Sequence, residues 1–266
     1  MDKLELYCVT NKPIKSLDNF KYKLAAVGKD KFPDNYIRCD NGINIYDKEK
    51  NYSELTFQYW FWKNKLNLNN DNWVGFCQKR RFWLNKSSVK EEITEKNFNK
   101  HFLIEPDPEW KNYNAIICSP INVNLAKKMK LIKRGIKSII KDPSLLFDKN
   151  KQTLKVHFDM HHGHGNLDKA VSLMNESDRD EFNLFLNNST SYNPHIMFIA
   201  KPNIANNWFV ALFDWLFECE KVFGFDNLEG YETQRLYAYL AERYLSFWFK
   251  KYTNYIEWPW TLYEFK

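Results

Sequence analysis

The stretch that decides the fold reads Trp73-Val74-Gly75-Phe76-Cys77-Gln78-Lys79-Arg80-Arg81. Its apolar first half predicts a short buried strand, and its basic second half closes that strand. Ligands of open α/β sheets bind at the carboxyl ends of strands, so we expect Arg80 and Arg81 to project into such a crevice. A guanidinium group matches phosphate geometry and keeps its charge at any working pH, which points to a diphosphate ligand. The alternative interpretation is a solvated basic turn.

Further strands and helices follow outward from this stretch. Apolar or alternating runs that end in turn residues predict strands at 4–9, 115–118 and 196–200. Helices are expected at 54–65, where Ser53 can act as the N-cap, and at 205–223 and 231–250. Because strands alternate with helices, the sequence favours an α/β layered domain over an all-helical one.

The composition is that of a globular protein. Hydrophobic residues make up 44% of the 266 positions and charged residues 27%, which excludes a disordered, collagenous or coiled-coil chain. No apolar run approaches the roughly eighteen residues of a membrane span, and the N-terminal segment lacks a signal-peptide pattern, so we expect a cytoplasmic protein. The five cysteines are odd in number and form no Cys-x-x-Cys pair, which fits reduced thiols. The net charge of +6 suggests anionic partners.

Residues 157–164 read His-Phe-Asp-Met-His-His-Gly-His and hold four of the six histidines. The glycines at 163 and 165 make a helix unfavourable, so we expect a loop, where site residues concentrate. Imidazoles and a carboxylate at this spacing can bind Zn²⁺ or another first-row metal. They can equally act as a general base near neutral pH. A surface loop with chance histidines is the alternative.

Three carboxylates, those of Asp214, Glu218 and Glu242, stand in helices that are otherwise apolar and aromatic. A carboxylate is costly to bury unless it is paired, so these residues are candidates for binding sugar hydroxyls or for salt bridges. Arg235 and Arg243 are available as partners, and the structural salt bridge is the commoner outcome.

Residues 124–141 carry seven Lys or Arg and no Asp or Glu, with apolar residues at three- and four-residue steps. This pattern predicts a basic amphipathic helix, able to lie on an anionic membrane surface or on a partner. Packing against the protein's own core is an equal alternative. Nucleic acid binding would need interleaved aromatics or a known module, and the sequence has neither, so no nucleic-acid partner is expected.

Together these blocks resemble a family of bacterial capsular and exopolysaccharide glycosyltransferases, first catalogued as a domain of unknown function. The resemblance covers roughly residues 4–249, with a poorly matched middle at 121–155. It rests on Val9-Thr10-Asn11-Lys12, Asp40-Asn41-Gly42-Ile43-Asn44-Ile45-Tyr46, Ser53-Glu54-Leu55-Thr56, Tyr59-Trp60-Phe61-Trp62-Lys63-Asn64, Gly75-Phe76-Cys77-Gln78-Lys79-Arg80-Arg81-Phe82, Met197-Phe198-Ile199, Trp215-Leu216-Phe217-Glu218-Cys219-Glu220, and Gln234-Arg235 through Leu240-Ala241-Glu242-Arg243. The chain departs from the family pattern at Gln78-Lys79, where the family has His-Tyr, and at Ile43 and Tyr46, where it has Asp and Ser.

The resemblance implies a GT-A-like (Rossmann-type) mixed sheet flanked by helices, with a helical C-terminal part. It implies a single domain over 1–266, with a nucleotide-binding half at about 1–120 and an acceptor-binding, helical half at about 121–266. The implied reaction moves a sugar, galactofuranose in some members, from a UDP donor to a capsular or other surface polysaccharide or a lipid-linked glycan. Where GT-A enzymes normally place Asp-x-Asp, this chain has Arg80 and Arg81, whose charge could replace Mn²⁺ at the departing diphosphate. We therefore expect a transferase that needs neither a divalent metal nor another cofactor.

Site residues follow from the same resemblance. The donor-binding residues are expected to be Thr10, Lys12, Asp40, Asn44, Arg80 and Arg81. Asp159, His161 or His162 would deprotonate the acceptor hydroxyl if the enzyme inverts. The residues that would bind acceptor hydroxyls or brace the site are Glu54, His164, Asp214, Glu218 and Glu242. The expected partners are a nucleotide-sugar donor and a glycan or lipid-linked acceptor, with peripheral contact through 124–141 to the inner face of the cytoplasmic membrane.

Two other functional classes stay open. A metal-dependent hydrolase would use the histidines at 157–164, and a non-catalytic module would bind an anionic surface through 124–141. Most of the ten tryptophans are expected to pack the core, and Trp110 has no assigned role. Only Trp258 and Trp260 remain for a sugar platform or a membrane anchor.

Overall fold

The computed structural model describes residues 3–125 and 128–265, which form two compact units. Unit 1 comprises residues 1–119, 195–211 and 248–266, and unit 2 comprises residues 120–194 and 212–247. The chain thus leaves unit 1 after Ser119 and returns to it twice.

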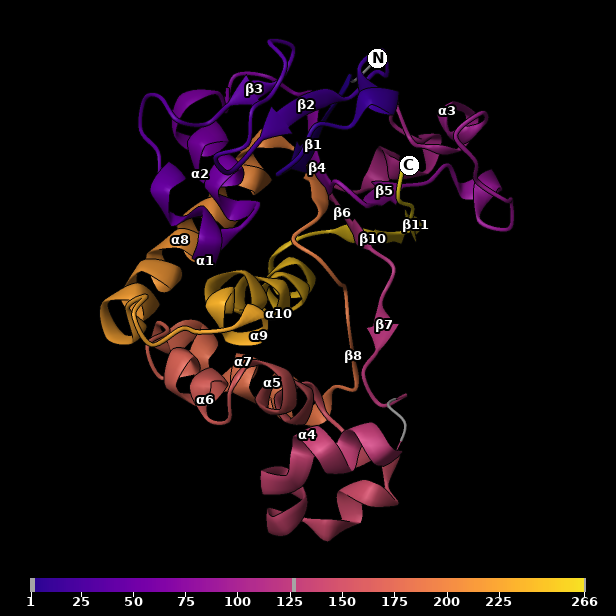
Figure 1. Cartoon of the computed structure of the whole chain (residues 1–266). Helices are drawn as coiled ribbons and strands as arrows, with labels where there is room; N and C mark the ends of the chain where they lie inside the picture. The colour runs from indigo at the N-terminus through magenta and orange to yellow at the C-terminus, as the bar shows by residue number, and fades with distance from the viewer. Residues whose placement is uncertain (1–2, 126–127, 266) are drawn as a thin grey trace. The chain divides into compact units, whose positions relative to one another are not determined.

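Unit 1 is built on a mixed, mostly parallel sheet, shown in Figure 1. Its strands are β1 (Leu4–Thr10), β2 (Lys23–Ala26), β3 (Ile37–Arg38), β4 (Trp73–Gln78), β5 (Arg81–Trp83), β6 (Ala115–Cys118), β9 (Phe198–Ala200), β10 (Tyr255–Trp258) and β11 (Trp260–Leu262). In the described part of the chain the order is β10-β6-β9-β4-β1-β2-β3, and β5 joins β4 to β11. β1 runs parallel to β2 and β4, β2 to β3, and β6 to β10, whereas β9 is antiparallel to β4 and β6.

Short helices and parts of two long ones complete unit 1. The helical elements are η1 (Lys15–Leu17), η2 (Tyr46–Lys48), α1 (Glu49–Tyr52), α2 (Leu55–Asn64), η3 (Lys86–Ser88), α3 (Phe98–His101) and η4 (Pro108–Asn112), with the beginning of α8 (Pro202–Phe223) and the end of α10 (Leu236–Tyr252). The expected α/β class, a mixed sheet flanked by helices, is confirmed.

The two faces of the sheet pack against different partners because side chains alternate along a strand. Tyr7 of β1 lies beside Phe76 of β4, and both rings contact Phe61 of α2. Leu6 and its neighbours on the other face belong to a large buried cluster. Gly75 in β4 leaves room in that cluster, since a Cβ there would lie 2.5 Å from Ile199 Cγ1 and 2.6 Å from Leu6 Cδ2.

The C-terminal tail forms part of the same sheet. Trp258 is fully buried, and its indole Nε1 donates a hydrogen bond of 2.9 Å to the Leu84 carbonyl. Trp110 packs edge-on against Trp258, which gives that tryptophan a role in the core. The prediction that Trp258 is available for a ligand is therefore wrong, because β10 and β11 pair with β6 and β5. Trp260 is partly buried, and its Nε1 donates to the Ser119 carbonyl over 3.0 Å.

Unit 2 is mainly helical. Its elements are β7 (Ile121–Asn122), α4 (Lys128–Lys141), η5 (Pro143–Leu146), η6 (Lys149–Lys151), α5 (Leu154–His162), α6 (Asn166–Val171), α7 (Glu176–Asn188), β8 (Ser191–Tyr192) and α9 (Tyr231–Gln234), with the remaining parts of α8 and α10. Phe182 of α7 packs against Trp215 and Tyr244 in its core. Trp215 also donates from Nε1 to the Ala170 carbonyl over 2.8 Å.

Two sequence expectations in unit 2 need correction. The histidine stretch is a helix, α5, for most of its length, because Gly163 ends the helix with a φ of 95° rather than preventing it. The expected helix 231–250 is interrupted at Arg235 between α9 and α10. The basic helix expected over 124–141 is present as α4, but residues 124 and 125 form a turn and the backbone at Gly135 is not helical (φ −103°, ψ 15°). Ala126 and Lys127 lie outside the described residues. Among described helices, none is both long and apolar enough to cross a bilayer.

Candidate functional site

The carboxyl ends of β1, β2, β3 and β4 meet at one edge of the sheet, because these strands are parallel. β2 and β3 lie on one side of β1, and β4 lies on the other, so the strand order reverses between β1 and β4. Such a reversal is the usual ligand position in open α/β sheets. The Lys79 side chain joins the two strand ends, with Nζ donating to Asn11 Oδ1 over 3.3 Å. We call the residues that follow these four strands the sheet-edge site.

A tight turn at the end of β1 shapes the first part of this site. Thr10 is buried, and its hydroxyl donates to the Lys12 carbonyl over 2.6 Å and accepts from the Lys12 amide over 3.1 Å. The Lys12 side chain is exposed. Thr10 thus positions Lys12, and its hydroxyl is already engaged within the turn.

Arg38 organises the ends of β2 and β3. Its guanidinium binds Asp40 over 3.1 Å and donates to the Tyr46 hydroxyl over 2.9 Å. That hydroxyl in turn donates to the Gly28 carbonyl over 2.6 Å, just beyond β2. Asp40 therefore lies at the expected edge, where its carboxylate is exposed and pairs with Arg38.

Helix α2 holds the loop that carries Asn44. Asn64 accepts from the Ile43 amide over 3.1 Å and donates to the Ile43 carbonyl over 2.8 Å. The loop can approach because Gly42 has a φ of 59°, and a Cβ there would lie 2.3 Å from Asn64 Oδ1. Asn44 itself closes the turn by donating to the Gly42 carbonyl over 2.9 Å. Asn64 of α2 thus holds the backbone of the loop next to Asn44.

The two arginines lie in the hairpin between β4 and β5. Arg81 donates from Nη1 to Gln78 Oε1 over 3.1 Å, while Arg80 lies 3.8 Å from Glu264. Both members of the second pair are largely exposed, so the ion pair is weak and leaves the guanidinium accessible. The sheet-edge site thus contains four cationic side chains, those of Lys12, Lys79, Arg80 and Arg81, near the reversal of strand order between β1 and β4. Such an arrangement is suited to binding a diphosphate.

The other predicted carboxylates lie on helices or next to one. Glu54 precedes α2 and is half-buried, and Asp214 is exposed on α8. Glu218, also exposed, forms a salt bridge of 2.5 Å with Lys221. Glu242 is mostly buried and pairs with Arg243 over 2.9 Å, the salt bridge that the sequence suggested.

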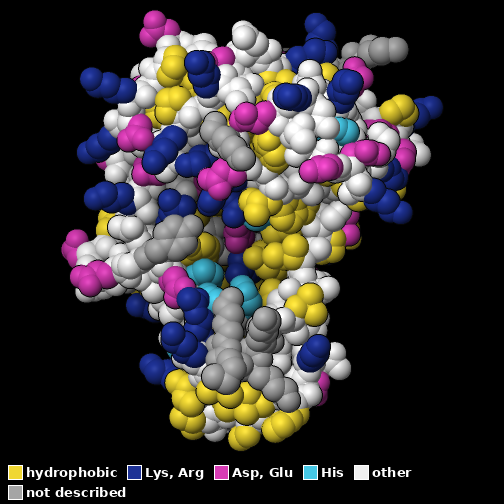
Figure 2. Space-filling model, turned by 45° about the vertical axis from the view of Figure 1, so that its right-hand side comes forward, with side chains coloured by type: hydrophobic (Ala, Val, Ile, Leu, Met, Phe, Trp, Pro, Cys, Tyr) yellow, Lys and Arg dark blue, Asp and Glu magenta, His cyan; other side chains and the backbone are white. Residues whose placement is uncertain are grey.

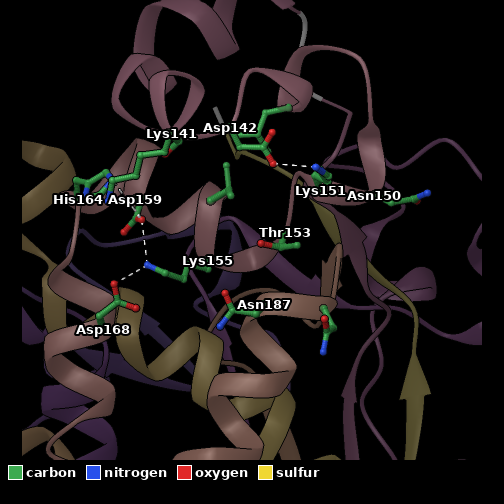
Figure 3. Close-up of a pocket in the computed structure, with 14 residues that line it drawn as sticks. Lys141, Asp142, Asn150, Lys151, Thr153, Lys155, Asp159, His164, Asp168 and Asn187 are labelled. Carbon is green, nitrogen blue, oxygen red and sulfur yellow. Dashed lines mark hydrogen bonds and ion pairs between the residues drawn. The ribbon is translucent and has the colours of Figure 1, made fainter.

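Unit 2 contains a pocket of about 510 Å³ between its helices, shown in Figure 3. We call it the helix pocket. It is lined by Ser138, Lys141, Asp142, Leu145, Asn150, Lys151, Thr153, Lys155, Val156, Asp159, His164, Asp168, Asn187 and Asn188. Two residues singled out from the sequence, Asp159 and His164, are among them. Their amide, hydroxyl, carboxylate and ammonium neighbours are groups that bind sugar hydroxyls.

Lys155 lies at the centre of the polar wall, between two carboxylates (Figure 3). Its Nζ is 3.1 Å from Asp159 Oδ2 and 2.7 Å from Asp168 Oδ2. Burial opposes the charged form, but hydrogen bonds and charge from the two carboxylates outweigh it and raise the pKa of Lys155. Asp159 also accepts from the Gly165 amide over 3.1 Å and lies 3.8 Å from His164 Nε2. This last distance is longer than a hydrogen bond, so the carboxylate and the imidazole share the pocket without such a bond between them.

His161 and His162 do not line this pocket. His162 is buried, stacks on the Tyr239 ring at 3.8 Å and binds the Glu232 carbonyl through Nδ1 over 2.9 Å. Burial, followed by the nearby charge of Arg243, lowers the pKa of His162 to about 3, so it is a weak base. His161 contacts Arg134 through Nδ1 at 2.7 Å. His161 and His162 therefore lie outside the helix pocket, which Asp159 and His164 line.

Metal-ligating side chains are also dispersed. Within residues 3–125 and 128–265, no three His, Cys, Asp or Glu side chains gather closely enough to hold a metal ion. The five cysteines are buried thiols without disulfides. The described residues thus offer no assembled centre for the metal-dependent hydrolase.

Sequence reasoning missed three residues that organise the two sites: Arg38, Asn64 and Lys155. The i, i+4 spacing of Lys155 and Asp159 was a usable signal once the stretch is recognised as helical. Asn64 contacts Ile43 from 21 residues away, and no local pattern indicates that contact.

The fold resembles that of a solved glycosyltransferase. A solved apo structure of the bifunctional glycosyltransferase WbbM is similar, with a TM-score of 0.76 at 19% sequence identity. The similarity covers 98% of this chain and 45% of that one, so the chain spans less than half the length of the solved protein. By sequence, residues 5–254 match the family described as Domain of unknown function (DUF4422), and the chain belongs to that family. No curated protein matches it.

Proposed function

We propose that this chain is a glycosyltransferase that moves a sugar from a UDP-sugar to a surface polysaccharide or a lipid-linked glycan. The observation that carries the proposal is the cationic sheet-edge site at the strand-order reversal of a glycosyltransferase fold. Galactofuranose is the sugar suggested by the family resemblance.

In the proposed donor complex, Arg80 and Arg81 bind the diphosphate, and Lys12 adds a third positive charge. Asp40 and Asn44, held by Arg38 and the loop contacts, face the nucleoside. Fixed guanidinium groups stabilise the negative charge that develops as the nucleoside diphosphate leaves, so transfer is proposed to proceed without a divalent metal.

For the acceptor we propose the helix pocket. In an inverting transfer the acceptor hydroxyl oxygen forms the new bond to the sugar's anomeric carbon as the bond to the diphosphate breaks. His164, whose Nε2 lies 3.8 Å from the Asp159 carboxylate, takes the hydroxyl proton, and the bonding electron pair leaves with the nucleoside diphosphate. Of the bases expected from the sequence, Asp159 lines the same pocket as His164, while the low pKa of His162 argues against that residue.

The test is calorimetric titration of the full chain with UDP, other nucleoside diphosphates and their sugars. We expect UDP to bind and the double variant Arg80→Ala/Arg81→Ala to weaken binding by at least tenfold, since each lost charged hydrogen bond is worth about 1.5–3 kcal/mol. The matched control is Lys3→Ala/Lys111→Ala, because these exposed lysines precede β1 and β6 at the opposite edge of the sheet. Equal UDP affinity in both double variants would refute the diphosphate role.

Metal dependence needs its own measurement. Turnover, followed as UDP release from the sugar donor that binds best, should persist in EDTA. Loss of turnover in EDTA that Mn²⁺ restores would contradict the metal-independent proposal while leaving the transferase assignment intact.

A further inference from the structure

Helix α4 presents an apolar stripe to solvent. Ile132, Ile136 and Ile140 recur at four-residue steps and are 43%, 50% and 73% exposed. Phe147 follows η5, which packs against α4, and is 79% exposed. Figure 2 shows hydrophobic side chains gathered at the lower end of the view, over the segment that holds α4 in Figure 1. Grouped exposed apolar residues mark interaction surfaces. We call these four residues the α4 surface.

The same helix is anchored to unit 2 by its other side. Gly135 is buried against Met160 of α5, where a Cβ would lie 3.2 Å from the Met160 sulfur, and Ser138 is buried one turn later. The alternative that the stripe packs on the protein's own core therefore fails for its three isoleucines. Their exposure follows from how α4 is docked.

The positive charge beside the exposed isoleucines indicates an anionic partner. Lys133 and Lys137 are exposed beside the isoleucines, and no acidic residue occurs between 124 and 141. Isoleucine and phenylalanine side chains can enter the boundary between headgroups and acyl chains while lysine ammonium groups meet anionic headgroups. A second copy of the chain would oppose like charges across a two-fold contact at this surface, which disfavours self-association.

We propose that the α4 surface binds an anionic lipid bilayer, with Ile132, Ile136, Ile140 and Phe147 inserted and with Lys133 and Lys137 on the headgroups. The inference depends on the exposure of the α4 surface and on the charge of the lysines beside it, and it would stand if the proposed transferase activity failed.

The experiment is co-sedimentation of the full chain with vesicles of phosphatidylcholine, and with an equal mixture of phosphatidylcholine and phosphatidylglycerol. We expect binding to the mixed vesicles only, weakened by added salt. Lys133→Gln/Lys137→Gln should lower the affinity roughly tenfold, and Ile132→Ser/Ile136→Ser/Ile140→Ser at least tenfold. Inorganic phosphate at matched ionic strength should release no more protein than chloride does.

Two control variants distinguish binding through the α4 surface from nonspecific hydrophobic or electrostatic adsorption to the vesicles. Leu184→Ser removes an equally exposed apolar side chain from α7, and Lys111→Gln removes an exposed lysine from unit 1, so both should bind as the unaltered chain does. Thermal unfolding checks that each variant is folded. The proposal is overturned if the unaltered chain does not bind the anionic vesicles. It is overturned too if Ile132→Ser/Ile136→Ser/Ile140→Ser binds them with unchanged affinity. It is also overturned if sedimentation velocity shows a dimer that only the isoleucine variant loses.

Discussion

The Arg81 guanidinium donates a hydrogen bond from Nη1 to Oε1 of Gln78 over 3.1 Å. The two residues are also paired positions of the β4–β5 ladder, so backbone and side chains align them together. Gln78 is buried and Arg81 is half-exposed, which means that a fixed amide orients a guanidinium at the edge of the sheet. Gln78 is also a position at which the chain departs from the pattern it resembles.

Gln78→Ala should therefore weaken UDP binding without abolishing it. Arg81 keeps its charge but loses its orienting partner, and we expect a threefold to tenfold loss of affinity, in line with about 1 kcal/mol for one hydrogen bond. Gln78→Glu should weaken UDP binding further, because the carboxylate would neutralise Arg81. Titration calorimetry compares the two variants. Equal affinities would contradict the positioning role of Gln78, and the control Lys111→Ala should bind normally.

Gly42→Ala should destabilise the loop after β3 for two separable reasons. The positive φ of 59° costs an L residue about 1–2 kcal/mol, and the Cβ would displace Asn64 from its hydrogen bonds. Gly224→Ala is the control, because Gly224 has a φ of 58° with no heavy atom within 4 Å of an added Cβ. In denaturant unfolding, Gly42→Ala should lose about 1–3 kcal/mol more than Gly224→Ala. Equal losses would mean that Asn64 contributes nothing there.

Asp159→Asn and His164→Asn should each lower kcat for transfer by about 10² or more, because general-base catalysis contributes roughly that much. The double variant should be little worse than either single variant, since the two residues act as one pair. UDP release from the preferred sugar donor is the measurement, with His101→Asn as a control in unit 1. Fully additive losses would argue that Asp159 and His164 act separately.

His162 should make the free energy of unfolding depend on pH. Its pKa is about 3 when folded, owing to burial and Arg243, against about 6.5 when unfolded, so the unfolded chain binds the extra proton between these values. Its contribution is complete above about pH 6.5 and is lost as the pH falls toward 3, by up to about 1 kcal/mol per pH unit. Glu242 and His161 also face this ring electrostatically, the first raising its pKa and the second lowering it.

His162→Gln should accordingly flatten the pH dependence between about pH 4 and pH 6. Urea unfolding at several pH values measures the slope. His101→Gln, a histidine bound to Ser88 in unit 1, serves as the control. A slope unchanged by His162→Gln would show that this imidazole is not held neutral by its surroundings.

Strands were predicted correctly where a short apolar run is closed by neighbouring turn residues. Trp73–Gln78 and Ala115–Cys118 are apolar runs closed by turn residues, and the structure has strands there. The loop predicted for the histidine stretch is wrong for a local reason too, because Gly163 terminates the helix and does not prevent it. The repeat of Leu154, Phe158 and His162 on one buried face of α5 was the signal that could have corrected it.

The sequence by itself determined several strands and helices, such as Trp73–Gln78 and Ala115–Cys118, and that Arg80 and Arg81 directly follow a buried strand. Only the tertiary structure decided that β4 lies beside β1, that Asn64 closes over Gly42 and that the tail buries Trp258. It also decided that the isoleucines of α4 face solvent while Asp159 and His164 share a pocket. The reason is physical: helix and strand preferences act over a few residues, whereas strand order and helix docking depend on burial and hydrogen bonds between segments far apart in the chain.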